Sequence, residues 1–413
     1  MKSEKRQVVI IGAGPSGSIA ASLLKQKGLD IVVIEKEVFP RFSIGESLLP
    51  ACMELIELAG MEDAVAAAGF QYKDGAAFRL GNQYQEFNFE DKFTEGPGTT
   101  FQVQRANFDK VLADEAQKQG VEIRFLHELQ SIEVLDECSI LSVTNELGEM
   151  YQIDADFVLD ASGFGRVLPK LLALETPSGL PPRQAIFTHI EDNIDSSLNK
   201  PYYDRNKILV TVHPDNRDVW YWLIPFANGC CSLGVVGEPE IFERYGDDNL
   251  SVLKKMVGEA PELAELLSNA AFVNDANAIV GYSANVSTLA TKRFALLGNA
   301  GEFLDPVFSS GVTIAMKSAK LAADCVEKQC LGHIVDWDME YSNPLKIGVD
   351  AFRTYVDGWY SGKLQHVIFY ENANPRIKQM ICAILAGYAW DTNNPYVKES
   401  DKRLNTLAEI CSD

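Results

Sequence analysis

Four short stretches of this 413-residue chain combine residue types that can do chemistry. Residues 12–17 read GAGPSG, the pattern GxGxxG, whose backbone N–H groups can hold a phosphate. Lys73 lies between apolar and glycine-rich segments, where loss of water would lower the pKa of its amine and make it a nucleophile. Residues 220–225 read WYWLIP, with two tryptophans on one face of a strand. Residues 303–311 read FLDPVFSSG ahead of a predicted helix, whose free N–H groups favour an anion.

The glycine-rich turn lies between two predicted strands of a parallel sheet. Residues 7–11 and 31–35 are short apolar β-branched runs, and residues 16–27 have helical spacing. The three glycines permit a tight turn, close approach of a pyrophosphate and packing of helix on strand. The acid that ends the second strand can accept from ribose hydroxyls and would repel a 2′-phosphate. The alternative is a glycine-rich turn without a ligand. We predict a site for FAD or NAD formed by Gly12, Ala13, Gly14, Ser16, Gly17 and Glu35.

Two later loops favour FAD over NAD. Residues 160–163 (DASG) and 297–301 (LGNAG) each follow a strand and place small residues at the carboxyl edge of the sheet. Together with Arg105 they resemble the FAD-binding elements of the glutathione-reductase-like flavoprotein superfamily, in its hydroxylase branch. In that branch the late motif carries an acid that holds the ribityl chain, whereas this chain has Asn299, an uncharged acceptor. No second strand–GxGxxG–helix unit is visible, which favours an external electron donor.

Four stretches carry a second resemblance, namely residues 38–50 (VFPRFSIGESLLP), residues 69–75 (GFQYKDG), the WxWxIP pattern at 220–225 and the FxxPxxSxG pattern at 303–311. Together they resemble the FAD-dependent halogenases of the phenol and pyrrole type. The resemblance covers about residues 7–330. It implies that reduced FAD, O2 and chloride or bromide give hypohalous acid, and that Lys73 passes the halogen to an electron-rich aromatic ring, either free or tethered to a carrier protein. Lys73 either forms a chloramine or hydrogen-bonds the hypohalous acid, and the sequence leaves both open.

The resemblance also assigns the other site residues. Ser310 and Gly311 would bind the halide, although this helix end can also serve only the flavin's pyrimidine carbonyl. Asp305 and Glu302 are candidates for removing the substrate proton, and Asp305 with Pro306 can instead form a structural turn. The predicted residues of the substrate channel are Trp220, Trp222, Phe303 and Pro306. The two tryptophans can instead be an aromatic pair of the core. The remaining predicted cofactor contacts are Lys36, Arg41, Arg105, Ala161, Gly163, Asn299, Gly311 and Val312.

Composition excludes several classes of protein. Asp and Glu total 58 against 37 Lys and Arg, a net charge of −21 that disfavours nucleic-acid and anionic-membrane partners. No apolar run is long enough to span a bilayer, and the first residues lack the features of a signal peptide, so we expect a cytoplasmic protein. The eight scattered cysteines predict reduced core thiols and no metal site, and the five histidines are interpreted as structural or surface residues.

The sequence predicts an α/β fold, which is α+β when the whole chain is considered. It combines a Rossmann-like parallel sheet of the glutathione-reductase type with an inserted antiparallel substrate domain and a helical C-terminal tail. Residues 129–153 predict an antiparallel meander, and residues 184–237 a half-exposed antiparallel sheet. The tail aromatics either close the substrate end of a cleft or form a packing face. The expected regions are 1–70, 104–165 and 291–330 for the cofactor, 71–103 and 166–290 for the substrate, and 331–413 for the tail.

Two alternatives stand beside the halogenase hypothesis, which needs a separate flavin reductase as its partner. The first is a halide-independent FAD oxidoreductase on the same scaffold, such as a monooxygenase, a dehydrogenase or a geranylgeranyl-reductase-like enzyme. The second is a non-catalytic flavin-binding protein.

Overall fold

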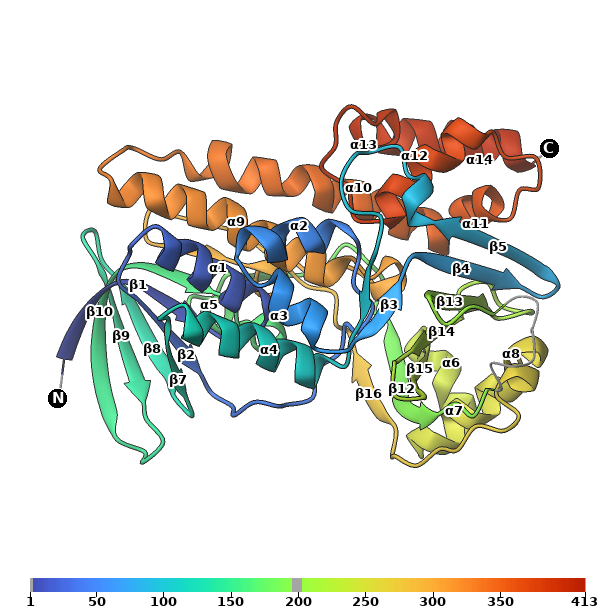
Figure 1. Ribbon diagram of the computed structural model, residues 1–413, viewed down its shortest axis with the longest axis horizontal. Helices are drawn as coiled ribbons and strands as arrows, with labels where there is room; N and C mark the ends of the chain where they lie inside the picture. Colours follow the sequence, from blue (N-terminus) through green and yellow to red (C-terminus); the bar gives the residue numbers. More distant parts are fainter. Residues whose placement is uncertain (1–2, 195–202, 413) are drawn as a thin grey trace.

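The computed structural model describes residues 3–194 and 203–412, and it contains two large sheets linked by long helices (Figure 1). In the first sheet, β1 pairs in parallel with β2 and β10, β2 with β7, and β10 with β18. The meander β8–β9–β10 extends this sheet on one side, as predicted for residues 129–153. The strands of the first sheet are β1 (Ser3–Ile11), β2 (Ile31–Glu35), β7 (Glu122–Phe125), β8 (Glu128–Val134), β9 (Ser139–Thr144), β10 (Met150–Asp160) and β18 (Phe294–Leu296).

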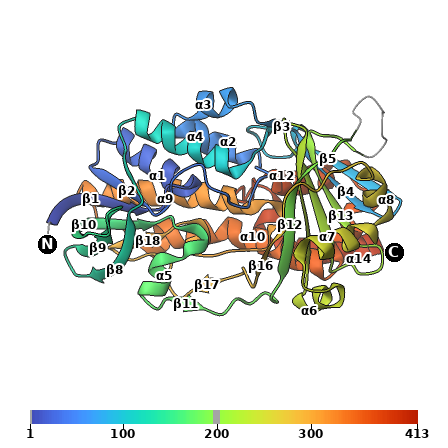
Figure 2. The ribbon, with the colours of Figure 1, turned by 90° about the horizontal axis from the view of Figure 1, so that it is seen from below.

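The second sheet is antiparallel except where β13 pairs with β4. It confirms the predicted antiparallel sheet, but the expectation that this sheet is half-exposed is wrong. Every residue of β13 and β14 is buried, because helices cover both faces (Figure 2). Residues 195–202 of the predicted stretch lie outside the described residues. The strands are β4 (Gly75–Leu80), β5 (Gln83–Asn88), β12 (Gln184–Glu191), β13 (Lys207–Val212), β14 (Trp220–Pro225), β15 (Cys230–Gly237) and β16 (Asn277–Val280).

Two small strand pairs complete the sheets. One joins β3 (Gln71–Lys73) to β6 (Thr100–Gln102), and the other joins β11 (Glu175–Thr176) to β17 (Asn285–Val286). The β3–β6 pair lies where the chain passes from the first large sheet to the second (Figure 1). It therefore places Lys73, the last residue of β3, at the junction of the two sheets.

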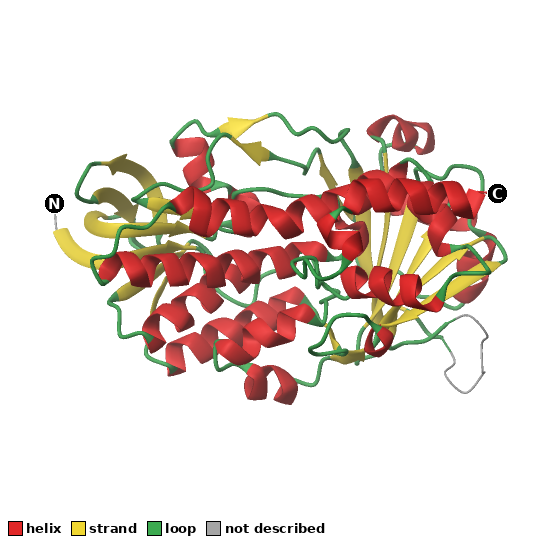
Figure 3. Cartoon of the chain, turned by 90° about the horizontal axis from the view of Figure 1, so that it is seen from above, coloured by secondary structure: helices red, strands yellow, loops and turns green. Residues whose placement is uncertain are grey.

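Long helices run across the first sheet and reach the second (Figure 3). Before the tail, the helices are α1 (Pro15–Gln26), α2 (Ala51–Leu58), α3 (Glu62–Ala67), α4 (Arg105–Lys118), α5 (Val167–Leu171), α6 (Pro239–Phe242), α7 (Asn249–Gly258), α8 (Pro261–Leu266) and α9 (Ser310–Cys330). The tail forms α10 (Asn343–Tyr360), α11 (Lys363–Ile368), α12 (Pro375–Leu385), α13 (Pro395–Lys398) and α14 (Ser400–Ser412). None of these described helices is both long and apolar enough to cross a bilayer.

The C-terminal tail bridges the two large sheets. Trp337, ahead of α10, stacks on Phe157 of β10 with ring centroids 4.7 Å apart. At the other end of α10, Trp359 lies 5.9 Å from the ring of Phe78 on β4. Both tryptophans are buried, so apolar burial fixes one sheet against the other through this helix. The boundaries of the three expected regions stay predictions.

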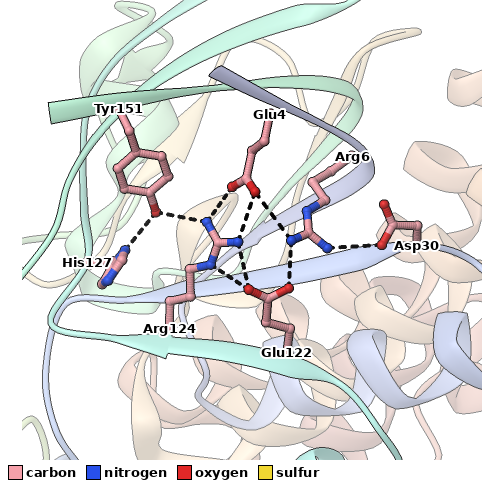
Figure 4. Close-up of polar contacts among 7 residues, drawn as sticks. All are labelled: Glu4, Arg6, Asp30, Glu122, Arg124, His127 and Tyr151. Carbon is pink, nitrogen blue, oxygen red and sulfur yellow. Dashed lines mark hydrogen bonds and ion pairs between the residues drawn. The ribbon is translucent and has the colours of Figure 1, made fainter. Parts of the chain in front are cut away.

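A network of alternating charges ties together the strands of the first sheet at the end where β1 begins (Figure 4). Arg124 on β7 contacts Glu4 on β1, and the hydrogen bond from Arg124 lowers the pKa of Glu4. Arg6 of β1 reaches Glu122 of β7 at 2.7 Å. These residues pair between β1 and β7, which lie on either side of β2, so each carboxylate of the network has a cation within reach. The sheet is therefore fixed at the end opposite to the glycine-rich turn.

All eight cysteines are free thiols. Cys52, Cys231, Cys325 and Cys382 are buried, in agreement with the interpretation as core residues. Cys330 is exposed at the end of α9, so that interpretation is wrong for this residue.

Replacing Gly348 with alanine should loosen the tail. A Cβ at Gly348 would lie 2.2 Å from the indole of Trp390, so either α10 or the indole must move. We expect Gly348→Ala to lower the free energy of unfolding in urea by about 2–3 kcal/mol. The control is Gly258→Ala at the end of α7, where no atom lies within 4 Å of the new Cβ. Equal stabilities of the two variants would contradict the packing described here.

Candidate active site at the junction of the two sheets

The glycine-rich turn joins β1 to α1, and two of its glycines have no space for a side chain. Gly12 has φ +97°, and a Cβ there would lie 2.6 Å from a backbone oxygen of the DASG loop. A Cβ on Gly17 would lie 1.9 Å from the carbonyl oxygen of Gly12. Beneath the turn, Glu35 accepts a hydrogen bond from the backbone N–H of Ala13 at 2.8 Å. The turn and the acid are therefore brought together as predicted, with Ser16 buried in the first turn of α1.

Two arginines and a buried carboxylate lie beside this turn. Asp109 on α4 accepts from Arg105 Nε and Nη2 at 2.7 and 3.0 Å and from Arg41 Nη1 at 3.2 Å. The second terminal nitrogen of Arg41 lies 3.5 Å from the Cβ position of Gly14. Arg41 Nε also forms an ion pair with Glu37 at 3.2 Å, and its terminal nitrogen facing Gly14 is placed to donate to a pyrophosphate. The sequence analysis missed Asp109, although its spacing of four residues from Arg105 on a helix was a usable signal.

The loops after β10 and β18 converge on the first turn of α9. Asn299 Oδ1 and the ring of Phe303 each lie 3.9 Å from the Cβ position of Gly311. Val312 lies 3.7 Å from the Cβ position of Gly45, which is also 2.9 Å from the guanidinium of Arg105. The structure therefore brings the predicted cofactor residues of all three segments into one row.

Two of the predicted cofactor residues lie at open positions. Gly163, in the DASG loop that follows Ala161, has φ +58°, and no atom lies within 4 Å of its Cβ position. Lys36 is exposed and lines a surface hollow of about 450 Å³ with Leu126 and Glu128. Lys36 therefore lines this hollow directly after Glu35, the last residue of β2. An elongated dinucleotide fits a row of this form better than a compact ligand.

Lys73 is completely buried, with 0% of its surface exposed. Its Nζ donates to Ser47 Oγ at 2.8 Å and to the carbonyl oxygen of Leu48 at 2.7 Å, and it lies 5.4 Å from the ring centroid of Phe89. Within residues 3–194 and 203–412, no carboxylate lies within ion-pair distance of this amine. Burial therefore lowers the pKa of Lys73 from 10.5 to about 7. Ser47 lies in the 38–50 stretch, but its contact with the amine was not predicted.

One side chain connects the surroundings of Lys73 to α9. Cys52 of α2 lies near Lys73, and its Sγ lies 3.1 Å from Thr313 Oγ1. Burial raises the pKa of the Cys52 thiol, which therefore stays protonated and carries no charge. Thr313 is in the first turn of α9, directly after Gly311 and Val312. No side chain caps this helix start, and Ser310 within it is buried.

Trp220 and Trp222 share one face of β14, with ring centroids 5.9 Å apart. Trp222 Nε1 donates to Ser232 Oγ at 3.0 Å, and Trp220 Nε1 donates to the hydroxyl of Tyr360 at 3.0 Å. Tyr360 ends α10, so the tail contributes a residue to the site. The sequence analysis counted Tyr360 among the tail aromatics that either close the cleft or form a packing face, but it did not predict the contact with Trp220.

The loop that contains Phe303 and Pro306 surrounds a buried carboxylate. Asp305 Oδ2 accepts from Tyr360 at 2.7 Å and from Tyr282 at 3.1 Å. Its Oδ1 accepts from the N–H of Val307 at 3.1 Å, as a turn residue would. Burial raises the pKa of Asp305. The ring of Phe303 packs edge-on against Tyr282 at 5.5 Å.

Two other titratable residues have defined partners. Glu302 forms an ion pair with Arg353 of α10. His189, interpreted as structural or surface, places Nε2 2.8 Å from Glu46 Oε1, next to the serine that contacts Lys73. No group of three His, Cys, Asp or Glu residues in the described part of the chain is arranged to hold a metal ion.

Comparisons with known proteins agree with this arrangement. Residues 5–227 match the family model for the FAD binding domain. A solved structure of a flavoprotein/dehydrogenase from Cytophaga hutchinsonii is 42% identical, covers 99% of both chains and superposes with a TM-score of 0.95.

Curated relatives include halogenases. A tryptophan 2-halogenase from Chondromyces crocatus is 30% identical over 79% of this chain, which spans only 62% of that protein's length. A 1H-pyrrole-2-carbonyl-[peptidyl-carrier protein] chlorinase from Pseudomonas fluorescens is 27% identical over 100% of this chain and 95% of its own.

The glycine-rich turn predicts different effects for two of its glycines. A Cβ on Gly14 meets only Arg41 at 3.5 Å and Asp109 at 3.9 Å, so Gly14→Ala should fold normally yet obstruct the phosphates. We expect its affinity for FAD, measured by fluorescence titration, to fall at least about tenfold. Gly17→Ala should instead lower the free energy of unfolding by about 3 kcal/mol or more. FAD affinity unchanged by Gly14→Ala would place the phosphates elsewhere.

The row of residues beside the glycine-rich turn, Arg41 at Gly14 and the match to the FAD binding domain lead to one conclusion. The chain belongs to the family of FAD-binding proteins that includes the flavin-dependent halogenases, and it is an FAD-dependent enzyme of the oxidoreductase class.

Proposed function

We propose that this protein is a flavin-dependent halogenase that transfers a halogen from chloride or bromide to an electron-rich aromatic ring through Lys73. The main support is the state of that lysine, a fully buried amine with a pKa of about 7 and no carboxylate partner in the described part of the chain. Two relatives of this chain are a tryptophan halogenase and a pyrrolyl-carrier chlorinase. A separate flavin reductase would supply the reduced cofactor, and the arene is either free or bound to a carrier protein.

Bound FAD, once reduced, would supply two electrons that act with two electrons from the halide to convert O2 into two waters. The halogen thereby becomes electrophilic. On the substrate, a carbon–halogen bond forms where a carbon–hydrogen bond breaks, and the ring releases its hydrogen as a proton. The site holds a candidate proton acceptor in Asp305, although its oxygens already accept from Tyr360 and Tyr282.

Residues of this chain would bind the halide, enclose the path of the oxidant and position the arene. The N–H groups at Ser310 and Gly311, with no side-chain cap and the positive end of the α9 dipole, would hold the halide. Trp220 and Trp222 would wall the path along which the oxidant travels and exclude water from it. The fixed position of Lys73 relative to the bound arene would set which ring carbon reacts.

Lys73 is well placed to carry the halogen in its neutral form. A neutral amine has two N–H bonds and one lone pair, and Ser47 Oγ and the Leu48 carbonyl oxygen match the two N–H bonds. The lone pair then remains for nucleophilic attack on hypohalous acid. In the ammonium form the third N–H would instead hydrogen-bond the hypohalous acid.

A second candidate is a halide-independent FAD oxidoreductase on the same scaffold. It is favoured by the 42% identity to a flavoprotein/dehydrogenase. The two candidates separate when purified protein receives reduced FAD, O2 and phenol or pyrrole probes in buffer with and without bromide. Brominated product supports the halogenase. Equal turnover without halide, giving only oxygenated or dehydrogenated product, supports the second candidate.

Replacing Lys73 with methionine should separate its chemical role from any structural one. We expect Lys73→Met to lower bromination of these probes, followed by mass spectrometry, at least about a hundredfold. The same variant should be more stable in urea by about 1–4 kcal/mol, because an apolar group replaces a desolvated amine. Lys317→Met is the control, since burial lowers the pKa of Lys317 as well, but this lysine lies over Trp390. Wild-type bromination by Lys73→Met would refute the mechanism.

The pH dependence should report the form of Lys73 that reacts. If the neutral amine carries the halogen, single-turnover bromination with pre-reduced FAD should rise through a pH of about 7 and then level off. A rate that falls through the same range would assign the reaction to the ammonium form. The free energy of unfolding should also rise with pH between about 7 and 10.5, where the unfolded chain binds a proton that the folded protein has released. Lys73→Met should remove both effects.

A further inference from the structure

Arg183, the residue before β12, is a buried cation whose hydrogen-bonding capacity is largely unused. Only 5% of its surface is exposed, and neither Nε nor Nη1 has a hydrogen-bond partner within the described residues. Its Nη2 lies 3.9 Å from Glu238, a half-exposed carboxylate at the outer limit of an ion pair. A desolvated guanidinium without acceptors is costly, so an arrangement of this kind points to a ligand that supplies them.

The aromatic ring of Tyr360 fixes the position of this guanidinium. The central carbon of Arg183 lies 3.8 Å from the ring centroid of Tyr360, in a cation–π contact. The nearby carboxylate of Asp305 accepts from Tyr360, Tyr282 and a backbone N–H, and within the described residues it forms no hydrogen bond with Arg183. Burial raises the pKa of Asp305, and the Arg183 guanidinium lies near enough to oppose that rise, although no hydrogen bond joins the two described side chains.

This cluster adjoins the predicted substrate channel. Tyr360 accepts from Trp220, Tyr282 contacts Phe303, and Asp305 directly precedes Pro306. Three of the four predicted channel residues therefore touch or adjoin the groups around Arg183. Arg124 in the first sheet also lies over a tyrosine ring, but unlike Arg183 it donates to Glu4, Glu122 and Tyr151 (Figure 4).

We propose that Arg183 binds an anionic oxygen of the aromatic substrate, either a phenolate or a carboxylate. A guanidinium forms charge-assisted hydrogen bonds with both groups, and its cation–π contact with Tyr360 holds it in place for them. Calling the ligand a substrate rests on the proposed function, whereas the anion site itself does not. A phenolate bound in this way would also be the more electron-rich form of the ring, which favours electrophilic substitution.

The test measures binding to the FAD-loaded protein without turnover. Two matched pairs of probes distinguish the sources of the oxyanion, namely 4-nitrophenol with 4-nitroanisole, and benzoate with benzamide. We expect wild-type protein to bind the anionic member of at least one pair about tenfold or more tightly than its neutral partner, by calorimetry. For 4-nitrophenol, binding should also increase the phenolate absorbance at constant pH, because the cation favours the ionised form.

Substitutions assign the preference to a residue. Arg183→Gln should remove the preference for the anion, Arg183→Lys should retain part of it, and Arg124→Gln should leave it unchanged. Equal binding of both members of both pairs by wild-type protein would overturn the proposal, as would an unchanged preference in Arg183→Gln. A fall of more than about tenfold in FAD affinity in Arg183→Gln would overturn it too, by assigning the arginine to the cofactor. Failure of bromination leaves these outcomes unaffected, so the two proposals can fail separately.

Discussion

The burial of the Lys73 amine, with no carboxylate beside it among the described residues, is the constraint on which the rest of this structure depends. Moving such a group from water into the junction of two sheets costs on the order of 5 kcal/mol, judged from a pKa lowered from 10.5 to about 7. The β3–β6 pair supplies the strand that carries Lys73, and the loop at Ser47 and Leu48 supplies its acceptors. Packing of both sheets must offset that cost, because the amine forms no ion pair with any residue that the structure describes.

The C-terminal tail provides much of that packing and reaches into the site as well. Trp337 and Trp359 lie at the two ends of one helical segment and are buried against different sheets. Trp359 also contacts the ring of Phe308, just before the serines that open α9. Of the two interpretations of the tail aromatics, packing therefore describes Trp390 and Trp359, while Tyr360 contacts Trp220, one of the predicted channel residues.

The parts of the fold that the sequence predicted are those with short-range causes. The turn at residues 12–17, the strand ending in Glu35 and the helix after Ser309 follow from glycine spacing and local periodicity. The second sheet was expected to be half-exposed because alternation along a strand cannot reveal a covering layer made by a distant segment. Asp109 was missed, but its spacing from Arg105 was a readable signal. The role of Arg183 could not be predicted from local spacing, because its contact residue Tyr360 belongs to the distant tail.

The hydrogen bonds from Trp220 to Tyr360 and from Tyr360 to Asp305 have a consequence for the way this scaffold can diversify. One chain of donors links the second sheet, the tail and the loop ahead of α9. A chimera that exchanges only the tail between relatives would remove a phenol from the centre of that chain and leave an indole and a carboxylate without their common neighbour. New substrate scope on this scaffold is thus expected to arise from coordinated changes in all three segments and not from exchange of modules.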